Sequence, residues 1–239
     1  MEINGFTGGL YRISSLITIF TGSNLLWILF NFPIVYLILC IIFAQNVSQI
    51  ITLGITILLI TPIVFFPATT ALYGVIRKWV YGEEIKIFQF YLRFYKENYI
   101  RSAVGGSLIC LMWIVLFADY YYFTTFFANW FIYLFIVVAI FSFIFTLHFF
   151  SLTVHIHVKL KDTFKFAILL TFGKPLLTLV LGAIIVLIMY LSFYMLTFLI
   201  PFFLGSLITY LSFYGFHKFY MKIHSFKITD QKISHTSIS

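Results

Sequence analysis

The amino-acid sequence predicts an all-α polytopic membrane protein with six transmembrane helices and both termini in the cytoplasm. Of its 239 residues, 62% are hydrophobic and 9% are charged, whereas a soluble domain carries about 25% charged residues. The apolar residues fall into six runs of roughly membrane-spanning length. None of the 15 Lys and Arg residues lies in the three connections that this arrangement places outside, as the positive-inside rule requires.

The predicted spans belong to one membrane domain that covers residues 1–239. They are residues 24–43, 50–76, 102–118, 130–154, 176–196 and 202–217, followed by a cytoplasmic tail over 218–239. The run from 176 to 216 carries no charge and would make about 60 Å of helix. Because the hydrocarbon core is about 30 Å thick, two crossings are expected here, with a tight outer turn near Pro201.

Two amphipathic helices are expected beside these spans. The first precedes span one, where an apolar stripe at helical spacing is formed by Leu10, Ile13, Leu16, Ile17 and Phe20. The second lies between spans two and three, with an apolar face of Phe88, Tyr91, Leu92, Tyr95 and Tyr99 and largely polar residues opposite. A helix of this kind lies on a membrane surface, so we expect the second one on the inner face.

The second predicted span is longer than the bilayer requires. Residues 50–76 would make about 40 Å of helix, and Pro62 and Pro67 interrupt its backbone hydrogen bonding. We expect a kink at Pro67 that directs the following basic residues to the inner surface. The small residues Ala68, Thr69 and Thr70 come next and are typical of close helix packing.

The polar residues form no recognisable catalytic or metal-binding pattern. None of the seven carboxylates lies within a predicted hydrocarbon core. His148 and His155 would share a helical face, but His157 is turned by about 200° from His155, so packed or interfacial histidines are favoured. We therefore expect no enzymatic activity, cofactor or metal. The net charge of +8 is interpreted as membrane topology rather than nucleic-acid binding.

The longest charged stretch runs from residue 77 to residue 101. Its candidate residues for contact with a partner or with lipid are Arg77, Lys78, Trp79, Glu83, Arg93, Lys96 and Arg101. One interpretation is a topology signal with lipid contact, worth about 1 kcal/mol per basic residue near anionic lipid. The other is a docking surface for a protein partner.

Four stretches resemble the YesL-like family of bacterial membrane proteins: SNLLW (Ser23–Trp27), FFPATTALYGVIRKW (Phe65–Trp79), GEE (Gly82–Glu84) and FYKENYIRS (Phe94–Ser102). The similarity is most specific from Pro67 to Ser102, and beyond Phe150 it rests on hydropathy. The resemblance implies a multi-pass protein of the bacterial cytoplasmic membrane without an established activity. Genes of such proteins often stand beside those for carbohydrate uptake and polysaccharide degradation, which implies a role near sugar uptake.

Two functions follow as expectations. The first is a non-catalytic accessory or regulatory component of carbohydrate uptake, which contacts a carbohydrate ABC transporter or another membrane protein through residues 77–101. The alternative is a small transporter or channel for an uncharged solute. A polar cavity between spans would favour the alternative, and its candidate lining is Asn24, Asn31, Thr69, Thr70 and Ser192. A sealed apolar bundle would favour the accessory role.

Overall fold

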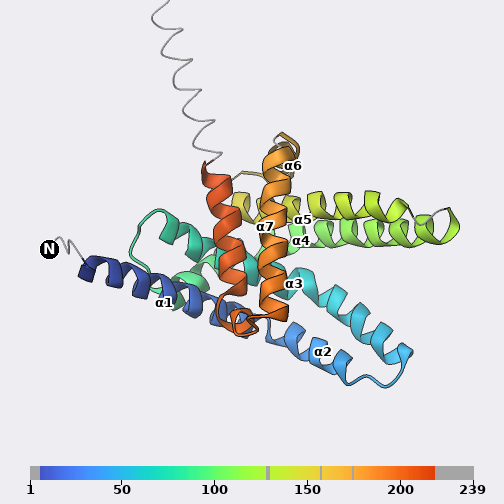
Figure 1. The fold of residues 1–239 in the computed structure, drawn as a ribbon, viewed down its shortest axis with the longest axis horizontal. Coiled ribbons are helices and arrows are strands. Elements are labelled where there is room, and N and C mark those ends of the chain that lie inside the picture. Colours follow the sequence, from blue (N-terminus) through green and yellow to red (C-terminus); the bar gives the residue numbers. More distant parts are fainter. Residues whose placement is uncertain (1–5, 128–129, 157, 174, 219–239) are drawn as a thin grey trace, which may run out of the picture.

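The computed structural model describes residues 6–127, 130–156, 158–173 and 175–218 (Figure 1). These residues form helices joined by short connections, and no strand occurs among them. The helices are α1 (Phe6–Phe30), α2 (Phe32–Ile42), α3 (Val47–Val80), α4 (Ile87–Phe126), α5 (Phe131–His155), α6 (Leu160–Gly173) and α7 (Pro175–Tyr194), followed by the π-helix η1 (Ile200–Leu204). A final helix covers residues 205–218. The all-α class is therefore confirmed.

Four of these helices are long and apolar enough to cross a membrane: α1 from Ile13 onward, α3, α4 and α5. The helices α6 and α7 meet at a bend of 92° and make a fifth candidate if they act as one broken span. With 11 residues, α2 would be only about 16 Å long. This set of helices indicates a membrane protein, while the six crossings and their orientation stay predictions.

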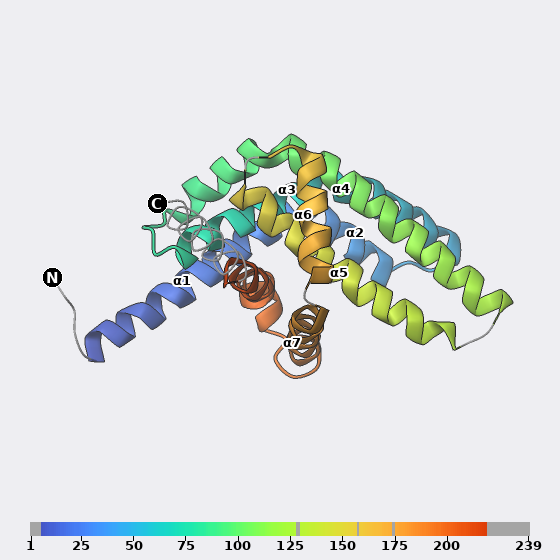
Figure 2. The same cartoon turned by 90° about the horizontal axis from the view of Figure 1, so that it is seen from above.

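The helix α3 is the centre of the fold. Every residue from Phe66 to Ile76 is buried, as expected for a helix with neighbours on all sides. One apolar cluster joins α3 through Phe66 and Tyr73 to Phe149 and Phe150 of α5. A second joins its Leu72 and Ile76 to α1 and α4. Figure 2 shows α1 at one end of the molecule and the second part of α4, paired with α5, at the other.

Three glycines allow aromatic rings to reach the backbone of neighbouring helices. A Cβ atom on Gly74 of α3 would overlap the ring of Phe94 in α4. A Cβ on Gly105 would overlap Phe149 of α5, and one on Gly106 would overlap Phe66 of α3. Close contact between α3, α4 and α5 therefore depends on the missing side chains, as small interface residues allow in membrane helices.

The first predicted span differs from the structure at Asn31. The expected interfacial helix and the start of the span form one continuous helix, α1, which ends at Phe30 before α2 begins at Phe32. Pro33 lies in the first turn of α2. A proline has no N–H and is tolerated in a first turn but not inside a helix, so the helix breaks at Asn31, two residues before it.

The predicted surface helix and the third predicted span are also continuous. Both belong to α4, whose 40 residues correspond to about 60 Å. Its buried stripe in this region consists of Tyr91, Phe94, Asn98 and Ser102, at the three- and four-residue spacing of one helical face. Phe88, expected on the apolar face, is 58% exposed. The early turns of α4 thus pack against the protein, and the predicted apolar face was partly wrong.

The turn expected near Pro201 is present. The chain leaves the helical conformation after Tyr194, turns over residues 195–198 and enters η1, which contains Pro201. The helix α3 is continuous through Pro62 and Pro67. The kink at Pro67 stays a prediction. Cys40 and Cys110 are both free. The predicted tail at 219–239 lies outside the described residues.

Topology can be measured with single cysteines in a variant that lacks Cys40 and Cys110. Under the six-span prediction, cysteines replacing Gln45, Thr124 or Phe198 react with an impermeant maleimide added outside intact cells. Cysteines replacing Lys86 or Lys161 react only after the cells are opened. Labelling at Lys161 from outside, with protection at Thr124, would contradict the six-span arrangement.

Candidate functional site

Two of the predicted surface arginines point into the protein, towards the end of α5. Arg77 donates from Nη1 to the carbonyl of Val154 at 2.6 Å. Arg101 donates from Nη1 to the carbonyl of Ile156 at 3.0 Å and from Nη2 to Oγ1 of Thr163 at 2.5 Å. The last carbonyls of a helix lack partners within the helix and form the negative end of its dipole. Both guanidinium groups therefore stabilise the C-terminus of α5.

A tyrosine and two histidines join three helices beside these arginines. The hydroxyl of Tyr81, which follows α3, lies 3.3 Å from Nδ1 of His155 in α5 and 3.1 Å from Nδ1 of His217 in the last helix. The Arg77 guanidinium is 5.8 Å from the centre of the Tyr81 ring. His148 is buried within α5, and His157 lies outside the described residues.

The described histidines do not form a metal-binding group. Within the described ranges, no cluster of three or more His, Cys, Asp or Glu residues could hold an ion. Tyr81 and His217 were not candidates in the sequence analysis. The sequence contains a signal for Tyr81, because Tyr73, Arg77 and Tyr81 follow at four-residue spacing on one helical face. In the structure this face is directed to α5, where Tyr73 stacks on Phe150.

The other predicted surface residues lie at the turn between α3 and α4 and along the first turns of α4. Lys78 forms an ion pair with Glu83, and its Nζ lies 4.4 Å from the centre of the Phe90 ring. Trp79 packs between Phe20 and Tyr210. These contacts fasten the turn to the protein.

An exposed row of basic side chains remains on α4. It consists of Arg93 and Lys96 together with Lys86, the residue just before the helix, and we call these three the basic edge. Arg93 donates from Nε to Glu97 at 2.7 Å, and both side chains stay largely exposed. Of the predicted surface residues, Arg77 and Arg101 thus bind inside the protein, whereas Arg93 and Lys96 face outward. Lys86, the third member of the basic edge, was not among the predicted surface residues.

The polar residues proposed to line a solute path form hydrogen bonds with other side chains and with the backbone, although the buried Oδ1 of Asn31 has no partner among the described residues. Thr69 accepts a hydrogen bond from Nε1 of Trp27 at 3.0 Å. Thr70 donates to the carbonyl of Phe66 and accepts from Ser102 at 2.8 Å. Asn31 and Ser192 donate to backbone carbonyls one turn earlier. These polar groups connect helices or satisfy backbone atoms.

Asn24 ties α1 to the irregular segment around Pro201. Its Nδ2 donates to the carbonyls of Ile200 at 3.1 Å and Pro201 at 2.7 Å, and its Oδ1 accepts from the backbone N–H of Ser206 at 3.1 Å. A Cβ on Gly205 would lie 2.8 Å from this Oδ1, so the glycine permits the approach. One side chain thus satisfies three backbone groups.

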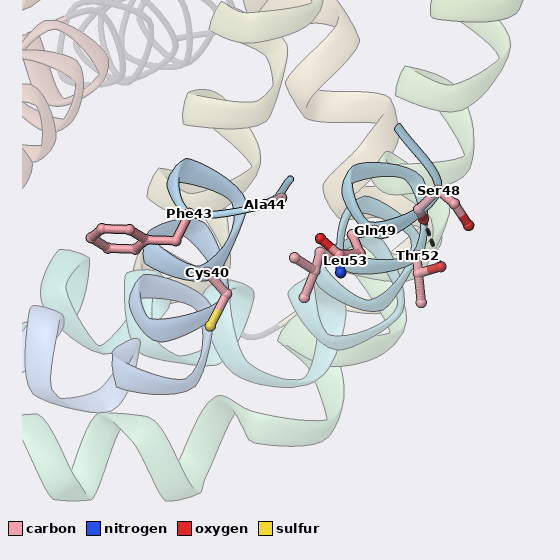
Figure 3. Close-up of a pocket in the computed structure, with 7 residues that line it drawn as sticks. All are labelled: Cys40, Phe43, Ala44, Ser48, Gln49, Thr52 and Leu53. Carbon is pink, nitrogen blue, oxygen red and sulfur yellow. Dashed lines mark hydrogen bonds between the residues drawn. The ribbon is translucent and has the colours of Figure 1, made fainter. Parts of the chain in front are cut away.

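A pocket of about 380 Å³ opens between the end of α2 and the start of α3. Figure 3 shows Gln49 and Leu53 projecting from α3 towards α2, where Cys40 lies, while Phe43 points away. Ser48 and Thr52 are, with Gln49, the polar lining residues, and Thr52 donates to the carbonyl of Ser48 at 2.9 Å. The residues that line the pocket carry no formal charge, which would suit an uncharged solute. The sequence analysis did not identify this pocket.

Comparison with known proteins confirms the resemblance to the YesL-like family. Residues 20–120 match the family described as "Protein of unknown function, DUF624". The chain is similar to three proteins of Bacillus subtilis (strain 168), each 28% identical. "Uncharacterized protein YteU" is matched over 88% of this chain and 84% of its own length. "Uncharacterized protein YesL" is matched over 60% and 68%.

The third relative, "Uncharacterized protein YesV", is matched over 64% of this chain and 76% of its own length. The match to YteU spans 216 residues, so the similarity extends beyond Phe150, where the sequence analysis had only hydropathy. No solved structure matches the chain.

Proposed function

We propose that this chain, as a relative of the YesL-like membrane proteins, is a non-catalytic accessory or regulatory component of a carbohydrate-uptake system. It docks through the basic edge of α4, Lys86, Arg93 and Lys96, onto a carbohydrate ABC transporter or another membrane protein. The proposed location is the cytoplasmic membrane of a bacterium, with the basic edge on the inner side.

The observation that carries the proposal is the division of the basic residues between inside and outside. Arg77 and Arg101 donate to backbone carbonyls at the end of α5, so their role in the folded structure accounts for their presence. Arg93 and Lys96 are exposed on α4, and Arg93 makes only a surface ion pair with Glu97, of a kind worth less than about 1 kcal/mol. Stability therefore does not account for this exposed charge.

The remaining support concerns the solute path and the class of partner. Polar side chains that could line a path through the bundle, such as Thr70 and Ser102, are bonded to each other, which is the arrangement expected of an accessory subunit. The association with carbohydrate uptake comes from the family resemblance found in the sequence.

Reversing the charge of the basic edge tests the docking proposal. The double substitution Arg93→Glu and Lys96→Glu should leave expression and insertion unchanged, because neither side chain is buried. We expect the partner to disappear when the protein is purified in mild detergent and its companions are identified by mass spectrometry. Charge repulsion replaces attraction at the contact, so the loss should be at least about tenfold.

The matched control is Lys161→Glu with Lys165→Glu on α6, where both lysines are also exposed. This variant has the same net charge and should retain the partner. If both variants keep the same companions and differ from the parent only in binding to anionic vesicles, the basic edge is a lipid contact and the docking proposal is wrong.

The alternative function, a small transporter or channel for an uncharged solute, is favoured by the pocket between α2 and α3. Vesicles that contain the purified chain alone distinguish the two functions. An accessory subunit gives no uptake of labelled sugar, whereas a transporter gives uptake that Gln49→Leu reduces and the basic-edge variant leaves unchanged. Uptake without any partner would refute the accessory role.

A further inference from the structure

The paired helices α4 and α5 form an open groove between them that the proposed function does not use. Two adjoining hollows, of about 310 and 420 Å³, share Tyr120 and Ile132 as lining residues. We call them together the α4–α5 groove. Figure 1 shows these two helices extending side by side away from the rest of the molecule. Phe117 is 72% exposed and Ile136 50% exposed, so the groove is open to its surroundings.

The chemistry of the groove changes along its length. One part is lined by apolar side chains, among them Trp113, Leu116, Ile136 and Ala139. The other part lies near the ends of the helices and is lined by Thr124, Trp130 and Tyr133 as well as Tyr120. The phenol and indole groups there carry hydrogen-bond donors. The groove is therefore apolar at one end and carries donors at the other, as an amphiphile requires.

The length of the groove corresponds to one leaflet of a bilayer. From Trp113 to Thr124 the helix advances 11 residues, or about 16 Å, which is half of a hydrocarbon core of about 30 Å. Aromatic residues such as Trp130 and Tyr133 are typical of the membrane–water interface. With these rings at the interface, the apolar end reaches the middle of the bilayer, and the groove runs alongside a single acyl chain.

The lining of the groove carries no formal charge. Asp119 is the only formally charged residue in the sequence between Arg101 and Lys159, and it is exposed next to Tyr120. Asp119 does not line the groove, and no basic side chain is among the lining residues either, so no lining group would pair with the charge of an anionic headgroup. The ligand is therefore a lipid without net charge.

We propose that the α4–α5 groove binds one acyl chain of a diacyl lipid whose headgroup has no net charge, with the headgroup beside Tyr120, Trp130 and Tyr133. An unfilled apolar hollow loses dispersion contacts on one side, and a chain of matching length restores them. The inference goes beyond the proposed function, because the basic edge lies on a different part of α4.

Native mass spectrometry of the purified full chain tests the proposal. Phosphatidylethanolamine and phosphatidylglycerol with the same acyl chains are added separately, and the one-lipid complex is titrated. Ala139→Phe fills the apolar part of the groove, and Ala118→Phe adds the same ring on an exposed face of α4 outside it. We expect one tightly bound phosphatidylethanolamine, weakened about tenfold by Ala139→Phe and unchanged by Ala118→Phe.

A fluorescence measurement keeps the test independent of the stability of the filled variant. In a variant whose only tryptophan is Trp113, phosphatidylethanolamine with brominated chains should quench its emission at a one-to-one ratio. Phosphatidylglycerol of the same chain length should require about tenfold more lipid, and Tyr133→Phe should reduce this preference.

Three results would overturn the proposal. Equal lipid binding by Ala139→Phe and Ala118→Phe would show unspecific coating of the surface. Tighter binding of phosphatidylglycerol than of phosphatidylethanolamine would refute the neutral headgroup. A dimer that forms without lipid and is abolished by Ala139→Phe would assign the groove to a second copy of the chain.

Discussion

Replacing Gly106 by alanine is expected to destabilise the protein, although alanine is the better helix former. The new Cβ would overlap the ring of Phe66, which is buried in the centre of the fold. Overpacking of this kind costs about 1–3 kcal/mol, whereas the gain in helix propensity is at most about 1 kcal/mol. The net loss should appear as a lower midpoint of unfolding in detergent, followed by tryptophan fluorescence.

Gly54 provides the matched control for this prediction. It lies in the same helix as Phe66, and nothing stands within 4 Å of a Cβ placed on it. Gly54→Ala should therefore be neutral or stabilising by up to about 1 kcal/mol. In the double variant Gly106→Ala with Phe66→Leu, the smaller side chain should restore part of the loss. Equal effects of Gly54→Ala and Gly106→Ala would refute the close contact between α3 and α4.

Replacing Arg101 by alanine should have a comparably large effect at the end of α5. It removes hydrogen bonds to Ile156 and Thr163, and bonds that involve a charged group contribute about 1.5–3 kcal/mol. It also removes a cation from a helix C-terminus, where a partly buried one contributes up to about 2 kcal/mol. We expect the free energy of unfolding to fall by about 2–4 kcal/mol.

Two further variants identify the cause of this loss. Arg93→Ala removes an exposed arginine from the same helix and should change the unfolding free energy by less than about 1 kcal/mol. Arg101→Lys keeps the charge but lacks the planar fork that reaches two partners, so it should recover only part of the stability. Hydrogen exchange should accelerate in the last turn of α5 and the first turn of α6. Unchanged exchange there would exclude the capping role.

Composition and hydropathy sufficed to predict the class of fold, and the small residues after Pro67 predicted close helix packing there. A helix such as Phe66–Ile76, with apolar or small residues on every face, is expected to be surrounded by other helices. The close packing through Gly105 and Gly106 depends on which rings face them. Those rings come from residues about 40 positions away in either direction, so spacing within α4 alone does not reveal them.

The direction of Arg77 and Arg101 could not be predicted from hydropathy, which counts charges without showing where a side chain points. It depends on where α5 ends relative to α3 and α4, and packing sets that position. A partial signal exists, because Arg101 precedes Gly105 by four residues and shares its face, and Gly105 meets Phe149 of α5. The break at Asn31 was missed because the apolar run continues through it, although Pro33 marks the place.

The bonds of Asn24 also bear on the order in which the chain is assembled. Its partners Ile200 and Pro201 follow it by 176 and 177 residues, so all of these residues must be synthesised before the bonds can form. Until then α1 carries an amide without these partners, and an unpaired amide is costly to transfer from water to an apolar medium. Contacts of such long range form slowly. The helix α1 can therefore reach its final environment only after the segment around Pro201 has been synthesised and has packed against it.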